Sequence, residues 1–360
     1  MSIRLSTFSA LYSNVAKEMR NMLIGCTKKL LDELNIEPEV REAEENIFGW
    51  HANLLVIGRR KTIVLVNDSN RYVVVIYGLK TKDFKQLEKL IPMAIRNTFK
   101  EECIKEEVIN SYIERAGRIT LTKTKDRTLV ARMNKGCEIV QYFEDDINAG
   151  GMFQTGLSKW VSRTLVGDST GNYFHPNDQM YKDLEAFAGG PVIQCRAAVL
   201  RVDLELENHK VWRRLAVPLS KTFLEFHKIL QKAFGWSDSH LHEFFADEMD
   251  VKLNEDARLS EYIPAYEYLK YNYDFGDNWQ QYINVESLIE DYDKNYSICL
   301  GGDGIAPPED VGGEAGYEEF LKIMSDQTSP EYQDTAAWAK SQGYREFDIE
   351  SVNRFLKYVD

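Results

Sequence analysis

The N-terminal half of the chain alternates between short apolar runs and amphipathic stretches. Three runs rich in β-branched and aromatic residues cover residues 53–57, 62–67 and 72–77, and the turn-like sequences GRRK and NDSN separate them. Such runs are typical of strands, and the short turns predict an antiparallel meander. Apolar residues at helical spacing then predict an amphipathic helix over residues 82–99. Further helices are expected at residues 28–35, 106–116, 128–143 and 154–165.

The C-terminal half has a different order of elements. It opens with two strand-like runs, and a helix over residues 221–236 follows, in which Thr222 and Glu225 have the spacing of a capping box. The expected strands are residues 195–208, 210–219, 240–247, 268–275 and 277–285, and the expected closing helices are residues 317–324, 331–340 and 349–358. Strands and helices are mixed without a regular βαβ alternation, so both halves predict the α+β class.

The length of 360 residues suggests two domains. The segment from Gly167 to Gly190 is rich in Gly, Asn, Asp and Ser, a composition typical of a connector. A short helix is possible within it, at residues 179–187. We therefore predict one domain at residues 22–166, a linker at residues 167–191 and a second domain at residues 192–360.

Charge is distributed unevenly between the two halves. Residues 1–166 hold 26 Lys and Arg against 21 Asp and Glu, whereas residues 167–360 hold 18 against 36. The acidic balance of the whole chain argues against nonspecific binding of nucleic acid, but the N-terminal half alone permits it.

The five cysteines are far apart and form no C-x-x-C pair, which excludes a zinc finger and favours reduced thiols. The N-terminus has no apolar secretory signal, and no apolar run approaches the roughly 18 residues that span a bilayer. We therefore expect a cytoplasmic protein without a membrane partner.

Two motifs in the C-terminal half are distinctive: DFGDNW at residues 274–279 and PPEDVGGEAGYEEFL at residues 307–321. With them, residues 192–358 resemble the plasmid pRiA4b ORF-3-like family, sometimes labelled TnpR-type passengers of insertion elements. The resemblance implies an α+β fold of unknown activity and a setting in mobile elements. Members often have His at the position of Gln281 and Cys at the position of Val311, so no ligand role is expected at these two positions here.

The N-terminal half resembles a small uncharacterised bacterial domain of unknown function. The resemblance is carried by MLIGCTKKLL, WHANLLVIGRRKTIVLVND and KDRTLVARMN, and it extends over residues 22–165. Such domains begin near the equivalent of Met22. Residues 1–21 are therefore interpreted as an N-terminal extension, and translation could start at Met1 or at Met22.

A group of acids and histidines in the C-terminal half could carry chemistry. The candidate catalytic residues are Asp274, Asp277, Glu286, Glu309 and Asp310, and the candidate metal ligands are His240, His242, Asp274 and Asp277. Carboxylate oxygens and imidazole nitrogens bind divalent cations, and a metal-activated water can hydrolyse a phosphodiester. The alternative is structural, because Asp and Glu also cap turns and helix starts.

A basic stretch in the N-terminal half could contact nucleic acid. Residues 51–100 hold ten Lys and Arg against three Asp and Glu. Arg59, Arg60 and Lys61 are expected in a hairpin turn, and Lys82 and Lys85 on the polar side of the following helix. Such a patch suits phosphate contacts, although a merely solvated helix face explains it as well.

Aromatic residues around the DFGDNW motif allow two interpretations. Alternation along a strand places Tyr271, Tyr273 and Phe275 on one face. An exposed aromatic face can stack nucleobases. Ordinary core packing is the interpretation that we favour.

Two functions follow from these features, and the sequence leaves open whether the chain is an enzyme. The first is a nucleic-acid- or protein-binding factor associated with mobile elements or defence. The alternative is a metal-dependent phosphodiester hydrolase that uses the carboxylate and histidine cluster, with a divalent metal ion as its possible cofactor.

Overall fold

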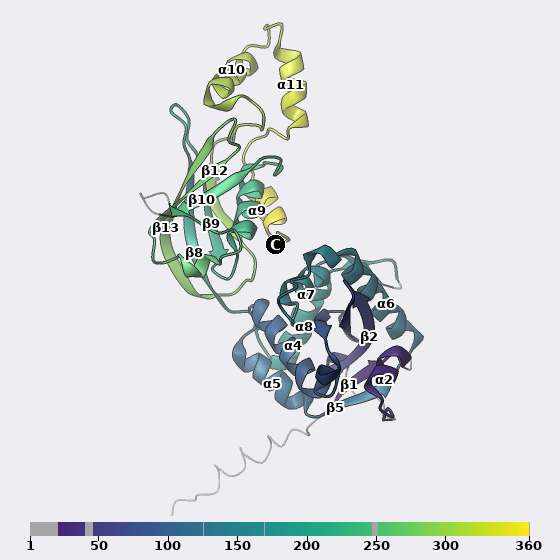
Figure 1. The fold of residues 1–360 in the computed structure, drawn as a ribbon. Coiled ribbons are helices and arrows are strands. Elements are labelled where there is room, and N and C mark those ends of the chain that lie inside the picture. Colours follow the sequence, from purple (N-terminus) through teal and green to yellow (C-terminus); the bar gives the residue numbers. More distant parts are fainter. Residues whose placement is uncertain (1–20, 40–45, 125, 169, 247–250, 360) are drawn as a thin grey trace, which may run out of the picture. The chain divides into compact units, whose positions relative to one another are not determined.

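The chain folds into two compact units, and the division between them falls between Val192 and Ile193 in the sequence (Figure 1). The computed structural model describes residues 21–39, 46–124, 126–168, 170–246 and 251–359. Each unit has its own sheet and its own hydrophobic core, and both mix helices with strands. The α+β class expected from the sequence is confirmed.

The N-terminal unit contains a five-stranded sheet in the order β4-β3-β2-β1-β5. Its strands are β1 (Met22–Cys26), β2 (Gly49–Ile57), β3 (Arg60–Asn67), β4 (Val73–Leu79) and β5 (Ile119–Lys123). The antiparallel meander of β2, β3 and β4 agrees with the prediction. The sequence did not indicate β1 and β5, which pair in parallel. Parallel pairing joins segments distant in sequence, so no local turn marks it.

Helices cover the N-terminal sheet. They are α2 (Lys28–Leu34), α3 (Thr81–Phe84), α4 (Leu87–Glu101), α5 (Glu106–Ala116), α6 (Arg127–Tyr142), α7 (Thr155–Ser162) and α8 (Pro176–Ala188). The helix expected over residues 82–99 is divided into α3 and α4, because the backbone leaves helical geometry at Gln86. Val64, Val66, Val73 and Val75 pack with Met133 of α6 in one core cluster.

The structure differs from the predicted linker at residues 167–191. This segment contains the small strand β7 (Tyr173–Phe174) and helix α8, and both belong to the N-terminal unit. Within α8, the Asp183 carboxylate accepts a hydrogen bond from the Asn70 side chain at 2.8 Å. The Gly- and Asp-rich composition marks a turn inside the domain, where Asp168 accepts hydrogen bonds from the backbone of Asn172 and Thr170.

The C-terminal unit contains a seven-stranded sheet in the order β11-β10-β12-β13-β8-β9-β14, and its strand pairs are antiparallel. Its strands are β8 (Cys195–Leu204), β9 (Val211–Pro218), β10 (His242–Ala246), β11 (Val251–Lys252), β12 (Tyr268–Tyr273), β13 (Trp279–Tyr292) and β14 (Ile298–Asp303). The expected hairpin is present as β12 and β13, which pair Tyr273 with Trp279 across the turn.

Helix α9 (Phe223–Phe234) packs on one face of this sheet, and the Thr222–Glu225 capping box is formed as expected. The other helices are α10 (Gly313–Ser325), α11 (Tyr332–Ser341) and α12 (Ile349–Leu356). None of the helices in the described parts of the chain combines the length and the apolar character that crossing a membrane requires.

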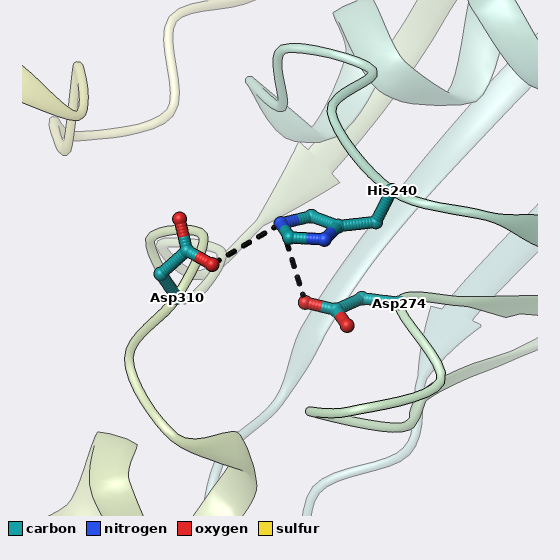
Figure 2. A group of neighbouring side chains, drawn as sticks. All are labelled: His240, Asp274 and Asp310. Carbon is teal, nitrogen blue, oxygen red and sulfur yellow. Dashed lines mark ion pairs between the residues drawn. The ribbon is translucent and has the colours of Figure 1, made fainter.

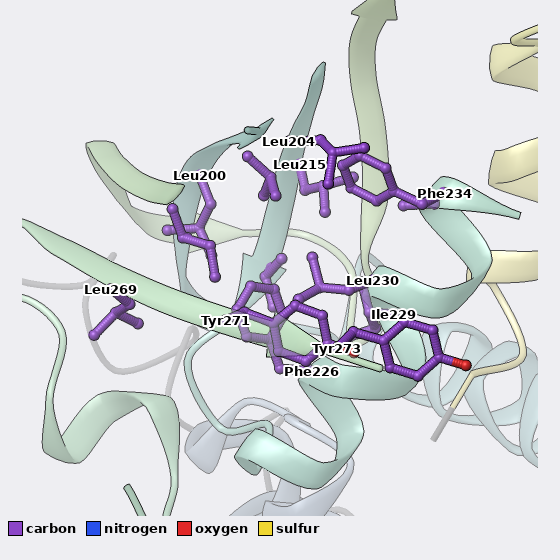
Figure 3. Close-up of a cluster of buried hydrophobic side chains, with 14 of the residues drawn as sticks. Leu200, Leu204, Leu215, Phe226, Ile229, Leu230, Phe234, Leu269, Tyr271 and Tyr273 are labelled. Carbon is purple, nitrogen blue, oxygen red and sulfur yellow. The ribbon is translucent and has the colours of Figure 1, made fainter. Parts of the chain in front are cut away.

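The aromatic residues near the DFGDNW motif lie mainly in the core. Tyr271 and Tyr273 are buried together with Phe226 and Leu230 of α9 (Figure 3). Phe275 is the exception, with half of its surface exposed. Core packing therefore accounts for the two tyrosines, and the buried face of the sheet is not available for base stacking.

Candidate metal centre

Three side chains of the C-terminal unit converge: His240, Asp274 and Asp310 (Figure 2). The Nε2 atom of His240 lies 3.5 Å from Oδ2 of Asp274 and 3.2 Å from Oδ1 of Asp310. The three atoms all lie within 4.8 Å of one another. Ligands held at about 2.0–2.2 Å from one cation stand about 2.8–3.6 Å apart in octahedral or tetrahedral geometry. Both measured separations fall in this range.

The contacts of His240 are not hydrogen bonds. Its Nε2 atom is buried and has no hydrogen-bond partner, although both carboxylates are close. A buried polar atom without a partner is uncommon in a folded protein. The nitrogen and the two oxygens therefore lie close together without hydrogen-bonding to each other.

The local structure of the β12–β13 turn orients Asp274. Its Oδ1 atom accepts hydrogen bonds from the backbone of Gly276 at 3.0 Å and of Asp277 at 3.3 Å, which leaves Oδ2 facing His240. The backbone N–H of Asp274 donates to the carbonyl of Leu241 at 3.0 Å and so joins the turn to the histidine segment. Asp274 and Asp310 both have a left-handed backbone, with φ of 56° and 59°. Asp and Asn tolerate this conformation better than most residues.

Glu309 connects the three segments that carry the candidate ligands. It is buried and accepts hydrogen bonds from the hydroxyls of Tyr273 and Ser237 and from the Ser237 backbone at 3.1 Å. Tyr273 directly precedes Asp274, Glu309 directly precedes Asp310, and Ser237 lies three residues before His240. Burial, followed by Glu309 itself, raises the pKa of Tyr273, so its hydroxyl stays protonated and can donate.

Two acids predicted as catalytic candidates have other roles. The Oδ2 atom of Asp277 accepts a hydrogen bond from the backbone of Gly312 at 3.2 Å, which supports the loop after Asp310. Glu286 lies further along β13 and forms an ion pair with Arg214. The structure thus brings Asp277 near the cluster as a support and places Glu286 elsewhere on the sheet.

His242 does not join the cluster with His240. Its ring stacks on His227 of α9, with ring centres 3.5 Å apart and planes inclined by 2°. Burial, with a smaller effect from His227, lowers the pKa of His242 to about 4, so it is neutral near pH 7. The His227 ring forms two hydrogen bonds: Nδ1 lies 2.7 Å from the Tyr271 hydroxyl, and Nε2 lies 2.6 Å from the Asp238 carboxylate. The sequence interpretation missed His227, because it lies beside the apolar stripe of a helix and resembles a core residue.

The two predicted basic segments of the N-terminal unit lie together. Lys61 pairs with Leu79 across β3 and β4, and its Nζ atom is 5.6 Å from the ring centre of Phe84 in α3. Lys82 belongs to the same short helix, and Lys85 follows it. The start of β3 and helix α3 therefore lie side by side and bring the basic residues together.

Not all five predicted cations of these segments are equally available. Lys61 forms an ion pair with Glu33 at 2.6 Å, and Arg60 donates to the carbonyl of Ala149 at 3.1 Å. Arg59 is exposed at the tip of the β2–β3 turn, and the two lysines of the α3 region are exposed as well. We define Arg59, Lys82 and Lys85 as the basic edge.

Comparisons with known proteins match the two units separately. Residues 196–355 match the family described as plasmid pRiA4b ORF-3-like protein, and residues 23–179 match a domain of unknown function (DUF6933). Over 163 residues the chain is 32% identical to the uncharacterized protein y4hQ of Sinorhizobium fredii, a match that covers 41% of this chain and 84% of that protein.

A solved structure is also similar. The protein of unknown function MM3350 from Methanosarcina mazei Go1 is 34% identical, with a TM-score of 0.39, and the match covers 43% of this chain and 96% of that one. None of these descriptions names an activity.

Proposed function

Because the chain belongs to the plasmid pRiA4b ORF-3-like family through its C-terminal unit, and that unit places one histidine beside two aspartates, we propose that it holds a divalent cation at His240, Asp274 and Asp310. The observation that carries the proposal is the buried Nε2 atom of His240, which has two carboxylate oxygens within 3.5 Å and no hydrogen bond. One imidazole nitrogen with carboxylate oxygens suits Mn²⁺, Fe²⁺ or Zn²⁺.

The proposed centre has the character of a reactive site more than of a structural one. Three protein ligands leave coordination positions for water or a substrate, as in catalytic sites, whereas structural zinc sites are closed. Asp310 has 65% of its side chain exposed, so solvent reaches the cluster from that side. A cation there would lower the pKa of a bound water and polarise a phosphoryl oxygen. Hydrolysis of a phosphodiester is the reaction that we propose for it.

Metal titration of the full chain tests the site. We expect binding of Mn²⁺ or Zn²⁺ by isothermal titration calorimetry, and at least tenfold weaker binding in H240Q and D274N. Asparagine at 274 preserves the turn hydrogen bonds and tolerates the left-handed backbone, so D274N removes charge with little strain. The matched control is H209Q, since His209 is 2.9 Å from Glu318 and forms a partly exposed His–carboxylate pair away from the cluster. Equal affinity in D274N and the unmodified chain would contradict the proposal.

The hydrolase reaction has a separate readout. The metal-loaded chain is expected to cleave bis(p-nitrophenyl) phosphate, with the rate lost in D274N and retained in H209Q. If metal binds with the predicted residue dependence but no cleavage occurs, the cation site stands and the hydrolase assignment does not.

A second function rests on the basic edge. Its three cations are exposed, and the packing of Lys61 over Phe84 brings the two basic segments together. We propose that the N-terminal unit contacts nucleic-acid phosphates there, since unpaired surface cations release counterions from the phosphate backbone.

Charge reversal tests this second function. The R59E/K85E variant is expected to bind single-stranded DNA at least tenfold more weakly at low salt. The slope of log Kd against log salt concentration should be shallower by about 1.4, because two phosphate contacts are lost and each contributes about 0.7 on single-stranded DNA. K322E is the control, as Lys322 of α10 is an exposed lysine beside Glu319. Unchanged DNA binding in R59E/K85E would reject the basic edge as the interface.

A further inference from the structure

A pocket in the N-terminal unit gathers three basic side chains. It is lined by Arg71 from the β3–β4 turn and by Arg132 and Lys135 from α6. Arg132 and Lys135 are three residues apart in the helix, so they lie on the same face. Several of the other lining residues are aliphatic, among them Val73 and Ile139. The pocket therefore combines an apolar wall with a cationic rim.

The two arginines are not paired with carboxylates. Arg71 donates to the carbonyl of Gly167 at 2.7 Å, and Arg132 donates to the carbonyl of Asp68 at 3.2 Å. In the part of the chain that the structure describes, neither guanidinium forms an ion pair with an acid. The Nε atom of Arg132 is buried without a hydrogen-bond partner. One donor of the pocket is thus desolvated and unused.

The positive charges of this pocket repel each other. Burial, and next the charge of Arg132, lower the pKa of Arg71 below its usual value, and the charge of Asp168 opposes them only in part. The acids nearby are otherwise engaged. The Asp68 carboxylate is bonded to His51 at 2.6 Å, and the Asp168 carboxylate accepts from its own loop.

Lys135 has an ion pair of its own, but at the surface. Its Nζ atom is 3.0 Å from Glu138, and both side chains are about two-thirds exposed. Exposed pairs of this kind contribute little and exchange readily with solvent. Lys135 can therefore turn toward an anion in the pocket, while the two arginines already line it.

We infer that this pocket binds a phosphate group through Arg71, Arg132 and Lys135. The guanidinium fork matches the spacing of phosphate oxygens. The pocket has a volume of about 20 Å³, and one water needs about 10–15 Å³, so phosphate oxygens can enter it while the rest of the ligand stays outside. Free phosphate and the terminal phosphate of a nucleic acid share this chemistry. The inference is independent of the metal centre, which lies in the other unit.

Titration of the full chain with inorganic phosphate, at ionic strength fixed with sodium chloride, tests the pocket. Binding is expected to weaken at least tenfold in R132Q and by about threefold in K135Q, and to stay unchanged in K322Q. Lys135 is exposed, so K135Q leaves the fold intact even if R132Q disturbs the contact with Asp68. Phosphate binding that is equal in R132Q, K135Q and the unmodified chain would overturn the inference.

Two additional measurements separate a phosphate site from a structural role and identify the ligand's source. Phosphate should raise the urea midpoint of the unmodified chain but not of R132Q, whereas loss of a structural arginine would lower the midpoint with or without phosphate.

A 5′-phosphorylated oligonucleotide is then compared with the same strand lacking that phosphate. Preference for the phosphorylated strand that disappears in R132Q assigns the site to nucleic-acid ends. Arg132-dependent binding of inorganic phosphate without that preference assigns it to free phosphate. Binding of neither ligand rejects the site.

Discussion

Replacement of Glu309 by alanine is expected to weaken Mn²⁺ or Zn²⁺ binding by about 10–100-fold, the usual effect of removing a group that orients metal ligands. The same variant should lose about 3 kcal/mol of unfolding free energy in the C-terminal unit, because hydrogen bonds to a buried charge are removed together. Glu309 accepts from Tyr273 and from two groups of Ser237. Without it, the segments carrying Asp274 and His240 lose their common anchor. Calorimetric metal titration and urea denaturation measure the two effects.

Two comparisons make the Glu309 result specific. E318A removes a partly exposed carboxylate that pairs with His209, and it should change stability by less than about 1 kcal/mol and leave metal affinity unchanged. E309Q keeps an acceptor for the Ser237 backbone, so its metal affinity should fall between those of E309A and the unmodified chain. If E309A bound metal normally despite its loss of stability, Glu309 would be structural without any role in placing the ligands.

The R163M variant should destabilise the N-terminal unit by about 3–5 kcal/mol, the usual cost of breaking a buried ion pair by removing one of its members. Two nitrogens of Arg163 bond Glu102 at 3.0 and 2.9 Å, and Glu102 is only 1% exposed. The hydroxyls of Tyr72 and Tyr181 also donate to Glu102, at 2.7 and 2.8 Å. These neutral donors remain in R163M but do not neutralise the carboxylate.

Urea denaturation of R163M and of a double variant checks this account. R163M/E102Q should recover part of the loss, since it removes both charges. R118M is the matched control, because Arg118 pairs with Glu39 at 3.1 Å on the surface and should cost less than about 1 kcal/mol. If R163M and R118M lost the same free energy of unfolding, burial of the Arg163–Glu102 pair would make no difference to its contribution.

Local patterns in the sequence predict the elements that local interactions determine. The Thr222–Glu225 capping box and the β12–β13 hairpin both depend on residues a few positions apart, and both are present. By contrast, β1 and β5 are short strands that are far apart in the sequence and pair in parallel. Their hydrogen bonds leave no periodic signal in either segment, so the sequence patterns did not predict these two strands.

The candidate centre could be predicted only in part from the sequence, for a similar reason. His240, Asp274 and Asp310 were all among the candidate residues, because Asp and His beside turns are typical of ligand positions. Which of the candidates meet depends on tertiary contacts: the Glu309 hydrogen bonds bring these three together, and strand direction carries Glu286 to a different part of β13. The phosphate pocket was not indicated at all, since its two arginines are far apart in the sequence and lie in ordinary polar surroundings.

The internal position of β1 in its sheet affects how the N-terminal unit is completed during protein synthesis. This first described strand lies between β2 and β5, and β5 leaves the ribosome only after β2, β3, β4 and three intervening helices have been made. Until then, one edge of β1 has unpaired backbone groups, which can recruit another extended chain. The nascent unit is therefore open to incorrect pairing until residues 119–123 have been made and close that edge.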